Sequence, residues 1–202
     1  MKLGMLVMLM LLVCSVANAL PGALTDVRYQ SGPQGLWGSY AEALVMYEGW
    51  GLDIVEVECE GYKELDLGVS RTIASRNGLT LTGELYTARA TGDQRYWIPA
   101  VYLLADKPTW HGQLAVLQYV PANGQSFEQT WVYLEAFSRQ KGYDLGISTE
   151  HIRLRCDPKV AADKYGVAAQ FPVGKLTGEV RLARVSEPSG WEVRYRLIGF
   201  FQ

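Results

Sequence analysis

The sequence predicts a mainly β domain of the α+β class, an antiparallel barrel or sandwich with a β-meander and one packed α-helix. Three observations support this class. Hairpin turn signals recur along the chain, short segments alternate apolar with polar residues, and a single well-capped segment shows helical spacing. There is no internal repeat, low-complexity stretch or charged linker, so residues 20–202 are interpreted as one domain.

Residues 1–19 have the pattern of a cleavable signal peptide. Lys2 precedes an apolar run from Leu3 to Val13, and Ala17-Asn18-Ala19 offers small residues for cleavage. The run is shorter than the roughly 20 residues that a membrane-spanning helix needs. We therefore expect an exported chain, periplasmic or extracellular and not inserted in a membrane. Cys14 raises a lipoprotein alternative, although Val13 before it is not the small residue that lipidation normally requires.

The expected mature chain retains two cysteines, Cys59 and Cys156, and an even number in an exported protein favours a disulfide. Such a bond would contribute about 4–5 kcal/mol in the chain-entropy model. The alternative is two buried free thiols. The chain has no Asn-x-Ser/Thr sequon, which favours a bacterial protein, and its net charge of −2 argues against a nucleic-acid partner.

The N-terminal part of the mature chain is expected to be extended and then β-rich. Residues 20–38 are rich in Gly and Pro and predict an extended segment. Residues 39–49 combine a capping box with strand and turn signals, so helix and strand both remain open. Residues 52–59 alternate β-branched with acidic residues and predict a half-buried strand.

A three-stranded meander is predicted between residues 67 and 105. Asn77-Gly78 is the preferred pair for a type I′ turn, and a second turn is expected at Gly92-Asp93. The first turn pairs Ile73 with Thr82, Arg71 with Glu84 and Val69 with Tyr86; the second pairs Ala100 with Leu85 and Leu104 with Leu81. The core face would then gather Leu81, Leu85, Ile98, Ala100, Tyr102 and Leu104. Pro99, which has no amide hydrogen, indicates an edge or a bulge.

The C-terminal half is expected to contain the one helix. Ser126 and Gln129 form a capping box, and Phe127, Trp131, Leu134 and Ser138 follow at helical spacing, which predicts a helix over residues 127–140. Residues 113–120 and 151–156 predict strands, and residues 157–175 are expected to be mostly loop. The last hairpin spans residues 176–200, with Trp191, Val193, Tyr195 and Leu197 on one face and Glu192, Arg194 and Arg196 on the other.

Charged residues are unevenly distributed. Acidic residues crowd between Asp53 and Asp66, and arginines populate the last third of the chain. The acidic group could hold calcium or supply a carboxylate pair for glycoside hydrolysis. The interpretation that we favour is mutual neutralisation within the fold, with Glu58 and Glu60 beside Arg153 and Arg155. The chain shows no catalytic motif, and neither a metal nor a cofactor is expected.

Aromatic residues are the remaining functional signal. Candidate binding residues are Trp37, Trp50, Trp97, Trp110 and His111, because flat rings in loops can stack on sugars or anchor a protein interface. The leading hypothesis is an exported non-catalytic binding protein that recognises a protein partner or a carbohydrate. The alternatives are a cell-envelope hydrolase that uses carboxylates and a small outer-membrane β-barrel, the latter suggested by the alternating final strand.

Overall fold

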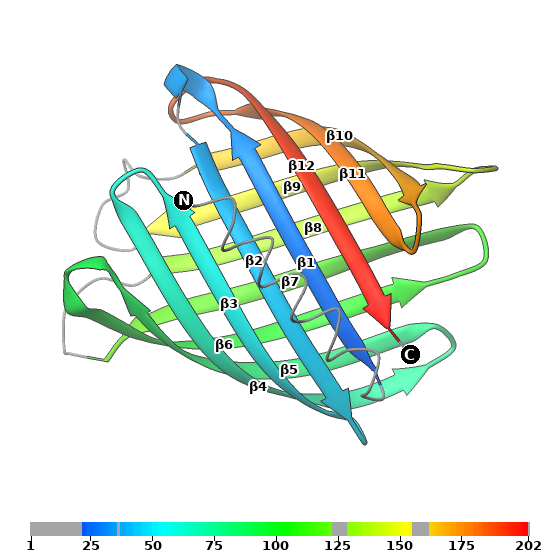
Figure 1. The fold of residues 1–202 in the computed structure, drawn as a ribbon, viewed down its shortest axis with the longest axis horizontal. Helices are drawn as coiled ribbons and strands as arrows, with labels where there is room; N and C mark the ends of the chain where they lie inside the picture. Colours follow the sequence, from blue (N-terminus) through cyan, green and yellow to red (C-terminus); the bar gives the residue numbers. More distant parts are fainter. Residues whose placement is uncertain (1–21, 36, 123–128, 155–161, 202) are drawn as a thin grey trace.

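The chain folds into a closed barrel of antiparallel strands in a computed structural model that describes residues 22–35, 37–122, 129–154 and 162–201 (Figure 1). The strands are β1 (Ala23–Ser31), β2 (Trp37–Tyr47), β3 (Trp50–Cys59), β4 (Tyr62–Arg76), β5 (Leu79–Ala90), β6 (Gln94–Asp106), β7 (Trp110–Pro121), β8 (Gln129–Arg139), β9 (Asp144–Leu154), β10 (Ala162–Val173), β11 (Leu176–Val185) and β12 (Gly190–Phe201). Each strand pairs with its sequence neighbours, and β1 pairs with β12 to close the ring. The predicted barrel is confirmed, and the sandwich alternative is not observed.

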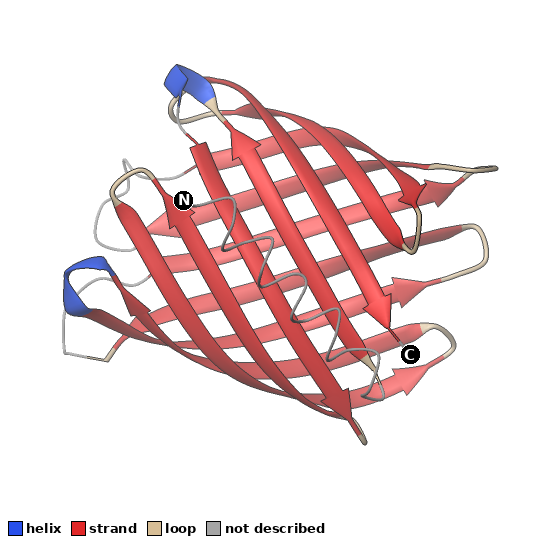
Figure 2. Ribbon diagram, in the orientation of Figure 1, coloured by secondary structure: helices blue, strands red, loops and turns tan. Residues whose placement is uncertain are grey.

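Two short 3-10 helices, η1 (Pro33–Gly35) and η2 (Thr91–Asp93), are the helical segments of the described residues (Figure 2). No helix in this part of the chain is long and apolar enough to cross a membrane. The predicted signal peptide over residues 1–19 lies outside the described residues.

The predicted helix over residues 127–140 is wrong where the structure describes it, because Gln129–Arg139 forms strand β8. Tyr133 and Phe137 face inward and are each 1% exposed, whereas Leu134 between them is 45% exposed on the outer surface. A strand with large apolar residues on both faces has no two-residue alternation of polarity. Without that alternation, the spacing of Trp131, Leu134 and Ser138 was the stronger pattern in the sequence, and it wrongly favoured a helix.

The two faces of the barrel are inverted relative to a soluble β domain. Along β4, Leu65, Leu67 and Val69 are about half exposed on the outer surface, while Glu64 and Asp66, which alternate with them, are buried inside. The last hairpin shows the predicted alternation, with Trp191 and Tyr195 outward and Arg194 inward. The barrel therefore presents apolar side chains outward and encloses charged ones.

The predicted meander exists, but its register is shifted. Pairing around Asn77-Gly78 follows the prediction as far as Ala74 opposite Leu81, and an irregularity at Ile73 then moves every later pair by one residue. The second turn contains three residues, so Leu85 lies opposite Pro99 rather than Ala100. A one-residue shift moves a side chain to the other face. The predicted core face is therefore right for Ile98 and Ala100, which are buried, and wrong for Leu85 and Leu104, which are exposed.

The remaining segments form strands. Residues 39–49, for which helix and strand were both open, belong largely to β2. The expected loop over residues 157–175 is wrong from Ala162 to Val173, which form β10. Pro99 does interrupt a ladder as predicted, because Trp97 pairs with Val120 and Ala100 with Leu117 while the positions between them have no partner in β7.

Candidate functional site

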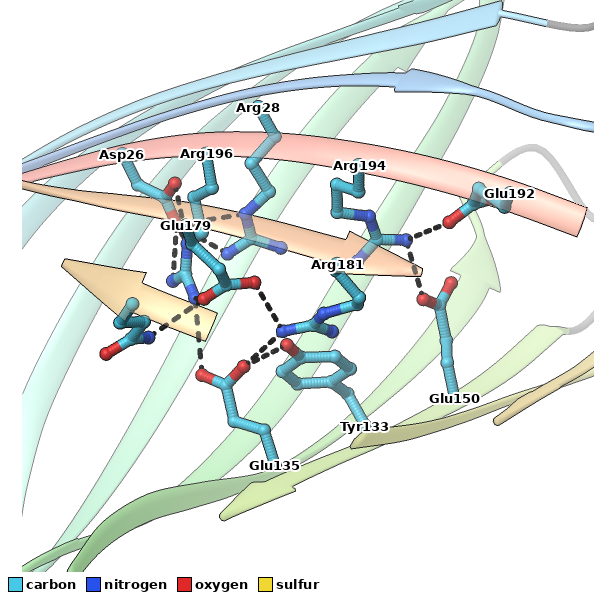
Figure 3. A network of polar contacts seen from close by, with 11 residues as sticks. Asp26, Arg28, Tyr133, Glu135, Glu150, Glu179, Arg181, Glu192, Arg194 and Arg196 are labelled. Carbon is cyan, nitrogen blue, oxygen red and sulfur yellow. Dashed lines mark hydrogen bonds and ion pairs between the residues drawn. The ribbon is translucent and has the colours of Figure 1, made fainter. Parts of the chain in front are cut away.

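An ion-pair network crosses the barrel interior between β1, β8, β11 and β12 (Figure 3). Arg196 of β12 donates from Nε and Nη2 to Asp26 of β1 at 2.9 and 2.6 Å, and from Nη1 to Glu135 of β8 at 3.2 Å. Arg181 of β11 donates to Glu135 at 2.5 Å and to Glu179 at 2.7 Å. We call Asp26, Arg28, Glu135, Glu179, Arg181 and Arg196 the central network. It joins four strands across the lumen.

A second group of ion pairs lies next to the central network along β12. Arg194 donates to Glu150 of β9 at 2.9 Å and to Glu192 at 3.1 Å (Figure 3). Lys164 of β10 also donates to Glu192, at 2.9 Å. Each lumen cation of these two groups therefore has at least one carboxylate partner.

The burial of these charges makes each partner structurally important. Asp26, Glu179 and Arg181 are at most 3% exposed. Taking an ion out of water costs several kcal/mol, and the pair is tolerated only while its partners satisfy it. Removing one partner of such a pair costs about 3–5 kcal/mol. The network therefore holds this part of the lumen in one arrangement.

Another part of the lumen wall, on β2 to β5, carries carboxylates without cations. We call Glu42, Asp53, Glu64, Asp66 and Glu84 the acidic wall; no ion pair between described residues includes any of them. Tyrosine hydroxyls donate to three of them: Tyr86 donates to Asp53 at 2.8 Å, Tyr40 donates to Glu42 at 2.6 Å, and Tyr62 donates to Glu64. Charge is thus segregated across the lumen.

Among the cavities lined by described residues, two lie inside the barrel and share no lining residue. One, of about 230 Å³, is bordered by Arg28 and Arg194; the other, of about 460 Å³, is bordered by Glu135 and Arg196. The central network has members on both, so it separates them.

We call the end of the barrel where β2–β3, β4–β5 and β10–β11 are joined the turn end, and the other end the loop end. The smaller cavity lies towards the loop end and is called the loop-end cavity.

The structure does not bring the predicted binding aromatics together. Trp50 and Trp110 open β3 and β7 at the turn end and are 51% and 42% exposed on the outer surface. Trp97 lies on the outer face of β6 nearer the loop end, where Trp37 opens β2. His111 faces the lumen instead.

His111 borders the larger cavity. Its ring stacks on Phe137 with the centroids 5.1 Å apart, and its Nε2 lies 2.9 Å from Asp144 Oδ2. Among the described residues, no group of three or more His, Cys, Asp or Glu side chains could hold a metal ion.

The predicted Cys59–Cys156 disulfide is not supported. Cys59 is half-buried in β3 and forms no disulfide with a described residue. Cys156 lies outside the described residues. The sequence also predicted that Arg153 and Arg155 neutralise Glu58 and Glu60. Arg155 lies outside the described residues, and Arg153 contacts Asp163 at 2.6 Å.

Sequence reasoning missed the residues of the central network. A signal for part of it was present as opposite charges two positions apart, in Asp26/Arg28 and Glu179/Arg181, and Glu192/Arg194 of the second group has the same spacing. Residues two apart in a strand share a face, and here apolar side chains occupy the positions between them. A charged face opposite an apolar face predicts a barrel with a polar interior.

No protein-family model matches the chain, and no curated protein matches it in sequence. Solved structures are similar to it. The NanC porin matches with a TM-score of 0.68 and 11% identity, covering 88% of this chain and 99% of that one. The KdgM porin matches with a TM-score of 0.62 and 12% identity, covering 89% and 98%. The COG4313 outer membrane channel from Pseudomonas putida F1 matches with a TM-score of 0.59 and 12% identity, covering 92% and 98%.

These similarities correct two predictions. The expected periplasmic or extracellular location and the expected lack of membrane insertion are contradicted, because the barrels that share this fold are two porins and an outer membrane channel. The same findings favour the outer-membrane barrel alternative over the leading hypothesis of a binding protein. At this level of identity the similarity is one of architecture, and the chain has the fold of a small outer-membrane channel barrel.

Proposed function

We propose that this protein is a narrow outer-membrane channel for small hydrophilic solutes. The observation that carries the proposal is the inverted distribution of side chains: apolar residues cover the outside of the closed barrel, and ion pairs and further carboxyl groups line the inside. A closed barrel satisfies all backbone hydrogen bonds between its strands, which hydrocarbon surroundings require. The charged interior offers water and polar solutes a path that lipid does not.

The outer surface has the features expected at a bilayer. The strands are 9–15 residues long, and a tilted strand of about 9–11 residues crosses the hydrocarbon layer. Aromatic side chains gather near both ends, as in the girdles of membrane barrels. Those near the turn end are Tyr47, Trp50, Trp110, Tyr143 and Phe171, and those nearer the loop end are Trp97, Tyr165 and Trp191. We therefore propose that Trp50, Trp97 and Trp110 contact the lipid interface.

The lengths of the connections support an orientation. The turn end has two-residue connections at residues 48–49, 77–78 and 174–175. The loop end has seven-residue connections at residues 122–128 and 155–161. Bacterial outer-membrane barrels have short periplasmic turns and longer extracellular loops. The turn end is therefore assigned to the periplasm, and residues 1–19 are proposed as the export signal that brings the chain there.

Transport through this barrel has to pass the central network. The two cavities form a vestibule on each side of it, and the charges between them select among solutes. KdgM has been solved in complex with disordered oligogalacturonate. In this chain the arginines of the lumen are already paired with carboxylates, so we assign it only the broader class of small hydrophilic solutes.

The test is conductance of the folded protein in a planar lipid bilayer. The mature chain is refolded in detergent, and heat-modifiable gel migration together with flotation on liposomes establishes that the barrel has inserted. Stepwise, reproducible conductance after insertion is the expected result. A barrel that inserts but conducts no ions at any voltage or salt concentration tested contradicts the channel. A chain that remains soluble without detergent contradicts insertion itself.

A further inference from the structure

We propose that the loop-end cavity binds a small solute that carries a positive charge on nitrogen, as an ammonium or guanidinium group. This deepens the proposed function by assigning a solute class to the channel, and it rests on that function for the solute's access to the cavity from outside the cell. Four features of the lumen support it: a carboxylate oxygen without a partner, further unpaired carboxylates beside it, arginines that are already paired, and aromatic faces.

Asp66 is the first of these features. Its side chain borders the loop-end cavity and is 5% exposed. Its Oδ1 is buried and has no hydrogen-bond partner. A buried carboxylate oxygen without a donor is costly, and a cationic N–H group supplies the strongest kind of donor. The cavity beside Asp66 has room for the molecule that brings such a group.

The carboxylates around Asp66 reinforce this preference. Asp53 Oδ1 and Glu84 Oε1 are also buried without a hydrogen-bond partner. The hydroxyls that contact the acidic wall belong to tyrosines and are neutral; for example, Tyr119 donates to Glu64 at 3.4 Å. Neutral donors leave these carboxyl groups without a positive partner. A solute with a positive charge favours their ionised form, and one with a negative charge disfavours it.

The cations that border the same cavity are already paired. Arg28 contacts Asp26 at 2.6 Å, and Arg194 lies between Glu150 and Glu192 at 2.9 and 3.1 Å. These pairs cancel much of the attraction that the arginines would offer to an anion. Arg194 Nε has no partner, so a neutral oxygen on the same solute, such as a hydroxyl, finds a donor there.

Aromatic rings provide the remaining contacts. Tyr86, Tyr102, Tyr119 and Trp131 all border the loop-end cavity. The face of an aromatic ring attracts a cation. Tyr40 in the same cavity already shows this contact, since the Arg28 guanidinium lies 4.3 Å from its ring centre.

The cation is organic rather than metallic. No group of three or more potential metal ligands exists in the part of the chain that the structure describes. A calcium ion takes about six to eight oxygen ligands at close range. A cavity of about 230 Å³ lined by rings instead suits a molecule with an apolar face and one charged end.

Three sugars that differ in charge and little in size provide the test. Galactosamine, galactose and galacturonate are titrated into the detergent-folded protein by calorimetry at about pH 7, where most of an amine of this kind is protonated. We expect galactosamine to bind at least about tenfold more tightly than galacturonate, with galactose between them. Equal or tighter binding of galacturonate overturns the proposal, and so does the absence of binding by all three.

Asp66→Asn locates the site, because it removes the charge and keeps the shape. We expect the affinity for galactosamine to fall by about tenfold and the affinity for galactose to stay unchanged. The matched control is Asp93→Asn, which makes the same change on an exposed residue of the β5–β6 connection that does not border the cavity. Unchanged galactosamine binding in folded Asp66→Asn overturns the assignment. The comparison of the three sugars on the unmodified chain needs no variant to fold.

These measurements separate the binding site from the channel. Calorimetry in detergent requires no conduction, so a protein that binds galactosamine but carries no current contradicts the channel and supports the site. A protein that conducts ions and prefers galacturonate supports the channel and contradicts the cation site.

Discussion

Arg196 of the last strand makes bidentate contact with Asp26 of the first strand, through Nε at 2.9 Å and Nη2 at 2.6 Å. The two residues are 170 positions apart in the chain, and their strands form the ladder that closes the barrel. The contact is buried, so it joins the ends of the sheet from the inside. Its loss has consequences that can be measured.

Arg196→Met should destabilise the barrel by about 3–5 kcal/mol, because it leaves the buried charges of Asp26 and Glu135 without their shared partner. The measurement is urea unfolding of the refolded protein in liposomes, followed by tryptophan fluorescence. Arg76→Met is the control, since Arg76 is exposed near the β4–β5 turn, and it should change stability by less than about 0.5 kcal/mol. Equal effects of the two substitutions would contradict the structural role of the Asp26 contact.

Val167→Arg tests whether the outer surface faces lipid. Val167 lies in the middle of β10 and is 61% exposed. An arginine near the bilayer midplane costs about 2–4 kcal/mol, so folding into liposomes should weaken by that amount. Glu60→Arg in the β3–β4 turn introduces the same side chain outside the strands and should be nearly neutral. If Val167→Arg folds as well as Glu60→Arg, this face does not contact hydrocarbon.

The paired substitution Glu179→Ala with Arg181→Ala should raise single-channel conductance. It removes two bulky members of the central network without changing net charge, and Glu135 keeps Arg196 as a partner. The two cavities should then merge. The control pair is Arg89→Ala with Asp93→Ala, which removes an exposed ion pair of 2.6 Å at the loop end. Conductance that is unchanged or reduced in the lumen variant, measured at the same salt concentration, would show that the central network does not limit flow.

Gly78→Ala should destabilise the β4–β5 hairpin by more than about 1 kcal/mol. Gly78 has a φ of 67°, and a Cβ there would lie 2.1 Å from the carbonyl oxygen of Asp106. Gly92→Ala is the control, because its φ of 77° brings similar backbone strain but its Cβ would meet nothing within 4 Å. Unfolding midpoints that fall equally in both variants would mean that contact with Asp106 adds nothing.

Local sequence signals predicted the hairpins well, but they did not predict the pairing of residues far apart in the sequence. Asn77-Gly78 located a turn from two residues, and the alternation from Trp191 to Leu197 defined β12. The irregularity at Ile73 left no mark in the sequence that would distinguish it from regular pairing. The three-residue turn between β5 and β6 likewise moved Leu85 from Ala100 to Pro99, so Leu85 lies on the opposite face from the one predicted.

The candidate site was harder to predict, because its members come from strands that meet only when the barrel closes. Arg196 and Glu135 are separated by 61 positions, and no local pattern joins them. The assumption of a soluble protein also directed attention to exposed tryptophans. In a barrel with an apolar exterior the informative residues are charges at alternate positions, such as Glu179 and Arg181.

The closing ladder also bears on the order in which this molecule assembles. Within the described strands, every ladder except β1 with β12 joins neighbours in sequence, so hairpins can form early at low entropic cost. Because β1 and β12 are the most distant strands in sequence, we expect their ladder to form last, and the two strands could pair in several registers. An offset of one residue would turn Asp26 and Arg28 towards lipid, while the observed pairing of Arg28 with Arg196 places both guanidinium groups beside Asp26. A misaligned ladder would lose these ion pairs and expose charges to lipid, so the observed register is the most stable one.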